Sequence, residues 1–330
     1  MSAANSPPAG LVDLAAERVG GKALIANDEF FAEKENLLKP GRGVFIPDKY
    51  TDRGKWMDGW ESRRRRTPGN DWCVIQLGLR GIVRQIDIDT NHFLGNHPPF
   101  ASLEACCLTS GAPTEATEWI EILPKSPLHP GSQNLFQITN GESWTHLRLN
   151  IFPDGGVARL RVYGVVLPDW SKLKPGELVD LAAVENGGVP LACSDMFFSS
   201  MNNLIMPGRS ENMGDGWETK RRRGPGYDWI VLKLGRPGSI RKIEVDTNHF
   251  KGNFPDTCSI EGCTAPDATT EQLTGHEVPW RALLPQTKLQ AHTRHFFEKE
   301  LSPFADCTHV RLNIFPDGGV SRLRVWGTVA

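Results

Sequence analysis

The chain has 330 residues, 39% hydrophobic and 23% charged, and its 37 Lys plus Arg against 39 Asp plus Glu give a net charge of −2. This balance argues against a general nucleic-acid or membrane-surface binder, either of which needs excess positive charge. No apolar run reaches the ~18–20 residues of a membrane-spanning helix, and residues 1–17 lack the basic and apolar segments of a secretory signal. We therefore expect a cytoplasmic protein that uses neither nucleic acid nor a membrane.

The seven cysteines show no regular spacing. None forms a CxxC pair, and most lie in or beside apolar runs. A secreted disulfide framework or a structural zinc site would show paired, regular spacing. We therefore expect small, reduced core residues and no cysteine chemistry.

The chain contains one long internal repeat. Leu-Val-Asp-Leu-Ala at residues 11–15 recurs at 178–182, and residues 58–97 align without gaps on 215–254 with 24 identities. A period of roughly 160 residues is far longer than the ~20–50 residues of a solenoid unit, so each copy is a whole domain. The sequence predicts a first repeat over 1–167, a linker rich in Pro and Gly over 168–177, and a second repeat over 178–330.

Within each copy, hydrophobic residues alternate with polar ones. This pattern covers residues 82–89, 147–152 and 159–162 of the first copy, with Ile86 and Ile88 on one face of their strand. Short alternating strands separated by Gly, Pro, Asn and Asp are typical of an antiparallel sandwich. We predict an all-β fold of two tandem β-sandwiches of the jelly-roll type.

The first polar block kept in both copies spans residues 58–72 and 215–229 and contains a run of basic residues. One interpretation is structural, with the arginines paired to nearby acids. The other is that an arginine fork binds the carboxylate of a small anionic substrate. The substrate-binding candidates of this block are Arg64, Arg65, Arg66, Arg221, Arg222, Arg223, Glu61 and Glu218.

The second block, residues 89–96 and 246–253, begins a loop directly after an alternating strand. Asp and Asn are typical of turns, but a turn does not account for the histidine that returns in both copies. A histidine at a strand end is suited to proton transfer; a packed, hydrogen-bonded histidine is the alternative. The candidates are catalytic His92, His249, Asp89 and Asp246, with Asn91, Asn248, Asn96 and Asn253 for substrate binding.

The third block is Asn-Ile-Phe-Pro-Asp-Gly-Gly-Val, at residues 150–157 and 313–320. Its Pro-Asp-Gly-Gly string is a turn by its own chemistry, so we expect a structural role for Asp154 and Asp317. The side chains of Asn150 and Asn313 are further candidates for hydrogen bonds to substrate.

Metal binding is compatible with the sequence but not required by it. Asp89 and His92, with an acid from the loop at Asp58, form a candidate site for a divalent Mn-like ion. The chain has no HExxH and no His-x-His pattern, and no GxSxG motif indicates a serine nucleophile.

The three blocks, each present twice, resemble those of the allantoicase family (allantoate amidinohydrolases) over residues 10–330. The resemblance implies two jelly-roll β-sandwiches of the galactose-binding-like kind. It also implies hydrolysis of allantoate to (S)-ureidoglycolate and urea in purine degradation. The first copy departs from the second by about ten extra residues, within 43–55, so the loops around the two sites differ and one copy alone can be competent.

Allantoate carries a carboxylate and two ureido groups on one carbon, and each group needs a partner. An arginine would bind the carboxylate, amide and acid side chains would bind the ureido groups, and His92 or His249 would act as acid or base. Asp89 or Asp246 would orient the histidine or hold a metal. We also expect a homo-oligomer. Two alternatives stay open: a non-catalytic β-sandwich that binds a small ligand, and a hydrolase of another ureido acid such as ureidoglycolate.

Overall fold

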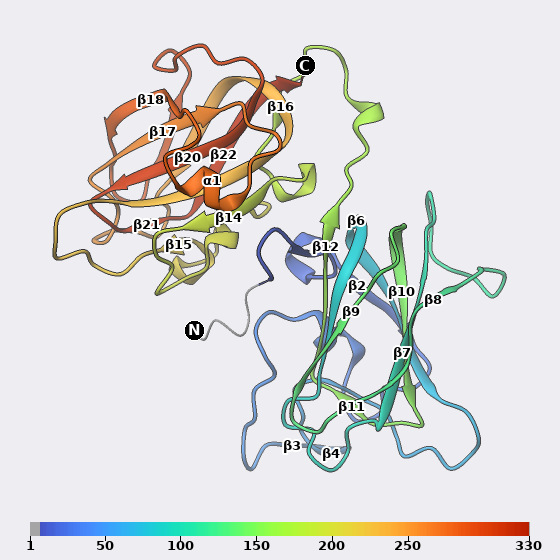
Figure 1. Cartoon of the computed structure of the whole chain (residues 1–330). Coiled ribbons are helices and arrows are strands. Elements are labelled where there is room, and N and C mark those ends of the chain that lie inside the picture. Colours follow the sequence, from blue (N-terminus) through green and yellow to red (C-terminus); the bar gives the residue numbers. More distant parts are fainter. Residues whose placement is uncertain (1–6, 330) are drawn as a thin grey trace. The chain divides into compact units, whose positions relative to one another are not determined.

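The computed structural model describes residues 7–329, which fall into two compact units (Figure 1). We call residues 11–167 the first unit, and residues 168–329 with residues 7–10 the second unit. Residues 1–6 of the predicted first repeat and Ala330 of the second lie outside the described part. The predicted linker, 168–177, contains a short 3-10 helix, Trp170–Lys172; the domain boundaries themselves stay a prediction. Between residues 7 and 329, no helix is long and apolar enough to cross a membrane.

The first unit is built from strands and two short 3-10 helices, Glu17–Val19 and Lys34–Leu38. Its strands are β1 (Val12–Asp13), β2 (Lys22–Ala26), β3 (Tyr50–Thr51), β4 (Gly54–Lys55), β5 (Trp60–Glu61), β6 (Asp71–Asp89), β7 (Phe100–Cys106), β8 (Ile120–Pro127), β9 (Gln133–Gln137), β10 (Ser143–Phe152), β11 (Gly156–Val157) and β12 (Arg159–Val166).

The second unit repeats this order without a counterpart of the β3–β4 hairpin, and its 3-10 helices Val184–Asn186 and Met201–Ile205 correspond to those of the first unit. It adds the 3-10 helix Met213–Asp215 and one short α-helix, α1 (Thr270–Thr274). Its strands are β13 (Val179–Asp180), β14 (Val189–Cys193), β15 (Trp217–Glu218), β16 (Asp228–Asp246), β17 (Thr257–Cys263), β18 (Arg281–Lys288), β19 (Arg294–Phe297), β20 (Cys307–Phe315), β21 (Gly319–Val320) and β22 (Arg322–Val329).

One long strand joins the two layers of each unit. In the first unit, the start of β6 pairs with β2 and β10, and its end pairs with β9 and β12, all antiparallel. The register of the β6–β10 ladder shifts between these halves, where Gly78 and Gly81 lie. The strand therefore leaves one sheet and enters the other, which produces a sandwich.

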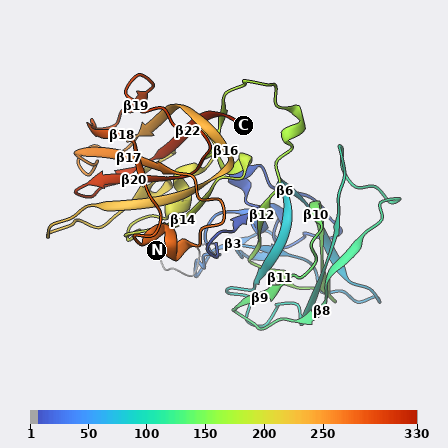
Figure 2. The same cartoon turned by 45° about the horizontal axis from the view of Figure 1, so that its top comes forward.

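The alternation read from the sequence corresponds to the buried face of the sandwich. Ile86 and Ile88 of β6 are fully buried, as are Leu147 and Leu149 of β10 and Leu160 of β12. Strand β16 of the second unit has the same partners in the same order, and β17, β18 and β20 lie side by side in both views of the molecule (Figures 1 and 2). The predicted all-β fold of two tandem repeats is confirmed.

Short strand pairs close the loop end of each sandwich. In the first unit, β5 pairs with β11, and β3 with β4 in a separate hairpin. In the second unit, β15 pairs with β21. The β5–β11 and β15–β21 pairs bring together the first and third polar blocks of their repeats, which lie about a hundred residues apart in the chain.

Candidate active site

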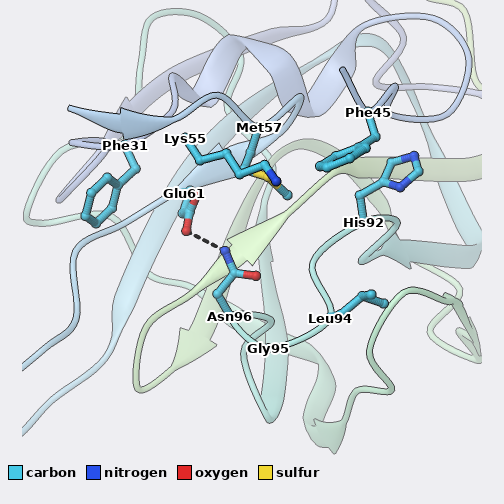
Figure 3. A pocket seen from close by; sticks show the side chains of 9 residues that line it. All are labelled: Phe31, Phe45, Lys55, Met57, Glu61, His92, Leu94, Gly95 and Asn96. Carbon is cyan, nitrogen blue, oxygen red and sulfur yellow. Dashed lines mark hydrogen bonds between the residues drawn. The ribbon is translucent and has the colours of Figure 1, made fainter. Parts of the chain in front are cut away.

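A cavity of about 380 Å³ lies in the first unit, within the range of about 300–1,000 Å³ that is usual for small-molecule sites. Glu61 and Asn96 face each other in it, with Phe31 on one side and Phe45 and His92 on the other (Figure 3). Its lining residues are Phe31, Phe45, Lys55, Met57, Glu61, His92, Leu94, Gly95 and Asn96. Three of the predicted site residues therefore meet in one cavity: Glu61, His92 and Asn96.

The backbone around Glu61 and Asn96 fixes both side chains. Strand β5 holds Glu61 between Ala32 on one side and Gly156 of β11 on the other. The N–H of Gly156 donates to the carbonyl oxygen of Asn96 at 2.8 Å. A Cβ atom at position 156 would lie 2.0 Å from the Phe93 ring, so only glycine allows this approach. The third polar block is thus a turn that positions the other two blocks.

The surroundings of Glu61 favour the protonated form of its carboxyl group. Its side chain is 9% exposed, and burial raises the pKa of the carboxyl above its ordinary value, while a hydrogen bond from Asn96 partly offsets that rise. The Asn96 Nδ2 atom donates to Glu61 Oε1 at 2.6 Å. A carboxyl with a raised pKa in a concave site is a candidate acid.

His92 begins the opposite wall of the cavity. Its backbone lies in the left-handed region, with φ of 69°, and its side chain is exposed. The ring centroid of Phe45 lies 5.5 Å from the imidazole centroid. This backbone conformation therefore directs the imidazole away from the sandwich core, and the imidazole lines the cavity.

The other members of the second block support the loop. Both oxygens of Asp89 accept hydrogen bonds from the Arg42 guanidinium, at 2.7 and 2.8 Å, and Asn91 donates to the carbonyl of Gly43 at 2.8 Å. Neither Asp89 nor Asn91 lines the cavity. These contacts connect the loop of His92 to the segment that begins at Arg42.

No arginine of the two basic runs lines the cavity. Arg65 pairs with Asp71 at 2.7 Å, and Arg222 pairs with Asp228 in the same manner. The backbone N–H groups of these arginines donate to the turn aspartates Asp154 and Asp317, respectively. The remaining arginines of the runs are exposed, and no contact within residues 7–329 holds them: Arg64, Arg66, Arg221 and Arg223.

Asn150 lies on β10 and Asn313 on β20, and neither is a lining residue of the cavity. Asn150 donates to Glu104 at 2.8 Å, and that carboxylate also accepts a bond from Arg148 at 2.7 Å. Asn313 makes the equivalent bond to Glu261. The side-chain amides of Asn150 and Asn313, predicted to bind substrate, thus donate hydrogen bonds to glutamates of the neighbouring strands β7 and β17.

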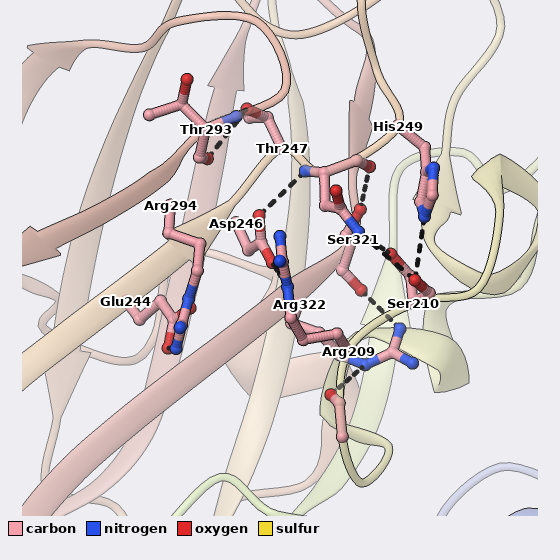
Figure 4. A network of polar contacts seen from close by, with 12 residues as sticks. Arg209, Ser210, Glu244, Asp246, Thr247, His249, Thr293, Arg294, Ser321 and Arg322 are labelled. Carbon is pink, nitrogen blue, oxygen red and sulfur yellow. Dashed lines mark hydrogen bonds and ion pairs between the residues drawn. The ribbon is translucent and has the colours of Figure 1, made fainter.

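The second unit carries the same polar groups in a different environment. Glu218 accepts a hydrogen bond from Asn253, and burial raises the pKa of its carboxyl. The imidazole Nε2 of His249 lies 2.9 Å from the carbonyl oxygen of Ser210 (Figure 4), and the backbone N–H of His249 donates to His292. The imidazole and the backbone N–H of His249 are thus both engaged in contacts within the second unit.

Two further predicted residues of the second unit also support its loop. Asn248 donates to Ser210, and Asp246 accepts the backbone N–H of Asn248 at 2.9 Å. The Arg209 guanidinium lies 3.7 Å from Asp246, farther than the matching pair in the first unit.

The cavity is bounded by a loop that only the first repeat possesses in full. The backbone of Val44 donates to the Asp58 carboxylate, and that of Glu211 donates to Asp215 at the equivalent place. Residues 44–57, which we call the extended loop, span these anchors in the first unit, and residues 211–214 span them in the second, ten fewer. The extended loop supplies three lining residues, Phe45, Lys55 and Met57.

Sequence reasoning did not identify these lining residues of the extended loop, nor Phe31 and Leu94. The extra residues of the first copy were the signal that could have found the first three, since they adjoin the first polar block. No group of three or more His, Cys, Asp or Glu in residues 7–329 is arranged to hold a metal ion. The predicted set of Asp89, His92 and an acid of the Asp58 loop is not such a group.

Comparison with known proteins decides the family. A model of the allantoicase repeat matches residues 12–167 and again residues 179–330. The chain belongs to the allantoicase family. It is 53% identical to a probable allantoicase of Burkholderia mallei over 96% of this chain and 94% of that one. It is 52% identical to a probable allantoicase of Pseudomonas fluorescens over the full length of both.

Solved structures of the family have the same fold over nearly the whole chain. A structure of allantoicase shares 39% identity and a TM-score of 0.83, covering 97% of this chain and 94% of that one. The crystal structure of the allantoicase from Saccharomyces cerevisiae is also 39% identical, with a TM-score of 0.81 over 97% and 93% of the two chains.

Proposed function

We propose that this protein hydrolyses allantoate to (S)-ureidoglycolate and urea, and that the cavity of the first repeat is where it does so. The activity is that of the family, to which the chain is related over its whole length. The observation that supports the location is the Glu61–Asn96 pair, a buried carboxyl with a raised pKa inside a cavity suited to a small molecule.

The reaction needs two proton transfers, and the cavity offers two groups for them. Glu61, whose pKa is raised by burial, acts as the acid and gives a proton to the ureido nitrogen as the bond from the central carbon to that nitrogen breaks. His92 accepts a proton from the water whose oxygen bonds to that carbon. One water is consumed, urea leaves, and the proton on His92 returns to Glu61 through solvent.

Asn96 has a positioning role in this scheme. Its amide holds Oε1 of Glu61, which leaves the other carboxyl oxygen to carry the proton. The apolar rings of Phe31 and Phe45 form the flanks of the cavity, and apolar walls strengthen the polar interactions beside them.

The test is turnover of allantoate by the purified protein, with urea release measured by colorimetry and ureidoglycolate identified by mass spectrometry. Equimolar urea and ureidoglycolate are expected. Allantoate that is bound but returned unchanged would support a non-catalytic module instead. Urea release from ureidoglycolate alone would reassign the substrate.

We further infer that the protein acts in the cytoplasm as a homo-oligomer. All seven cysteines are free thiols, as is usual in a reducing compartment. Exposed phenylalanines, such as Phe197 at 63% and Phe198 at 51%, support an assembly that would cover them. Cell fractionation and light scattering of the purified protein check the two statements.

A further inference from the structure

The cavity needs a cation if its ligand is a small carboxylate. A carboxylate that leaves water must gain a charged or strongly donating partner, because burial of an unpaired charge is very costly. The arginine runs do not meet this need, since Arg65 and Arg222 are paired with acids and no arginine lines the cavity.

Lys55 is the one lysine or arginine among the residues that line the cavity. It belongs to strand β4 of the extended loop, is exposed, and has no acid partner anywhere in the described chain. Its Nζ atom lies 4.5 Å from the centroid of the Phe45 ring, a cation–π contact that directs the ammonium along the cavity wall (Figure 3). Lys55 is therefore an available cation.

Within residues 7–329, no ion pair joins Lys55 to Glu61, the acid that shares the cavity. Glu61 is hydrogen-bonded to Asn96, and burial favours its protonated form. The ammonium of Lys55 thus keeps its attraction for an incoming anion.

The second repeat has no counterpart of this lysine. Its short segment, residues 211–214, reads Glu-Asn-Met-Gly and contains no basic residue. In place of an extended loop, the sulfur of Met213 lies 3.9 Å from the amide nitrogen of Asn253. The short segment therefore offers the Glu218–Asn253 pair no residue equivalent to Lys55.

We infer that Lys55 binds the carboxylate of the substrate, and that the extended loop thereby confines turnover to the first repeat. This inference rests on the proposed function, because the anion in question is allantoate. It assigns specificity to a residue outside the polar blocks: an acid substrate is distinguished from a neutral ureido compound by one lysine on a loop that the other repeat does not have.

The experiment compares Lys55→Met with Lys55→Arg and with Lys49→Met. Lys49 is a matched control because it lies on the same loop, with its Nζ over Trp56 at 3.7 Å, and does not line the cavity. Loss of a charge-assisted bond corresponds to about a 10- to 100-fold effect. Lys55→Met should raise KM for allantoate by that factor with kcat changed much less; Lys55→Arg should recover most of it, and Lys49→Met should match the wild type.

A second measurement separates this inference from the proposed function. Calorimetry of allantoate binding in a Glu61→Gln background, with and without Lys55→Met, needs no turnover and should show the same 10- to 100-fold weakening. An unchanged KM and an unchanged affinity in Lys55→Met would overturn the role of Lys55, even if the wild type releases urea. If the wild type releases no urea but Lys55→Met still weakens binding, the proposed reaction fails and the anion site stands.

Replacement of residues 44–57 by the segment Glu-Asn-Met-Gly of the second repeat tests the confinement. The short segment already joins equivalent anchors in the second unit, so the chimera should keep the fold, as circular dichroism can verify. Activity should fall at least as far as in Lys55→Met. A folded chimera with wild-type kcat/KM contradicts the inference.

Discussion

The two repeats share a scaffold and differ at the loop that closes the site. Asp89 and Asp246 occupy equivalent strand ends, yet Arg42 makes a two-pronged bond to the first, and Arg209 lies 3.7 Å from the second and is 57% exposed. The tight pair is located where the extended loop begins, and the loose one where the short segment begins. The sandwich thus provides the acid–amide pair in both repeats, and the extended loop adds Phe45, Lys55 and Met57 to the cavity of the first.

The largest difference between the repeats should appear when their acids are replaced. Glu61→Gln removes a general acid, a change that typically costs about 100- to 10,000-fold in rate, while Glu218→Gln should leave kcat/KM within a few-fold of the wild type. Steady-state urea release by the two variants measures this. Both glutamines can still bond to Asn96 or Asn253, so the folds should match.

Equal losses in the two variants would mean that both repeats turn over, and the asymmetry would be lost. The pH dependence of activity gives a second test of the role of Glu61. Because burial raises the pKa of Glu61, wild-type activity should fall as pH rises through that pKa, and this limb of the profile should disappear in Glu61→Gln.

The sequence predicted much of this arrangement because period and repetition are local signals. Alternation around Ile86 and Ile88 is enough to predict strands, and two copies of a block indicate which polar residues to inspect. The partners of those residues are not local. The backbone N–H of Arg65 donates to the carboxylate of Asp154, 89 positions away in the chain. No pattern in the basic run indicates this contact.

The cavity was the least predictable part for the same physical reason. Lys55 and Phe45 lie in a loop without hydrophobic period and without a second copy for comparison. Their roles depend on where the β3–β4 hairpin is placed against the loop of His92, which is a property of the tertiary structure.

Stability should also differ between matched ion pairs of the two repeats. The Arg159–Asp58 pair is 3% and 9% exposed, and the equivalent Arg322–Asp215 pair is 4% and 23% exposed. Asp58→Asn leaves a buried guanidinium without its counter-charge, which costs about 3–5 kcal/mol. Asp215→Asn should cost less, since water reaches its carboxylate more readily. Urea unfolding of both variants measures the difference, and a larger loss for Asp215→Asn would contradict this account of burial.

The smallest expected effect concerns the acid two residues before each strand end. Asp87 is 1% exposed, and burial raises its pKa to about 6, with a bond from Gln133 and the charges of Arg161 and Arg42 opposing the rise and that of Asp89 adding to it. One of its oxygens is buried and has no hydrogen-bond partner in the described chain. Its counterpart, Glu244, is bonded through both oxygens to Arg294.

The sign of the pH effect follows from this raised pKa. The unfolded chain releases the Asp87 proton near pH 4 and the folded chain near pH 6, so the folded state loses stability as pH rises through that window. Asp87→Asn removes the loss and should stabilise the protein above pH 7 by up to about 3 kcal/mol, with little change at pH 4. Glu244→Gln, which weakens a half-exposed pair, should destabilise by about 1 kcal/mol or less. Unfolding at pH 4.5 and pH 8 distinguishes them. A gain in Asp87→Asn that is equal at both values would show that packing, and not ionisation, sets the behaviour of this site.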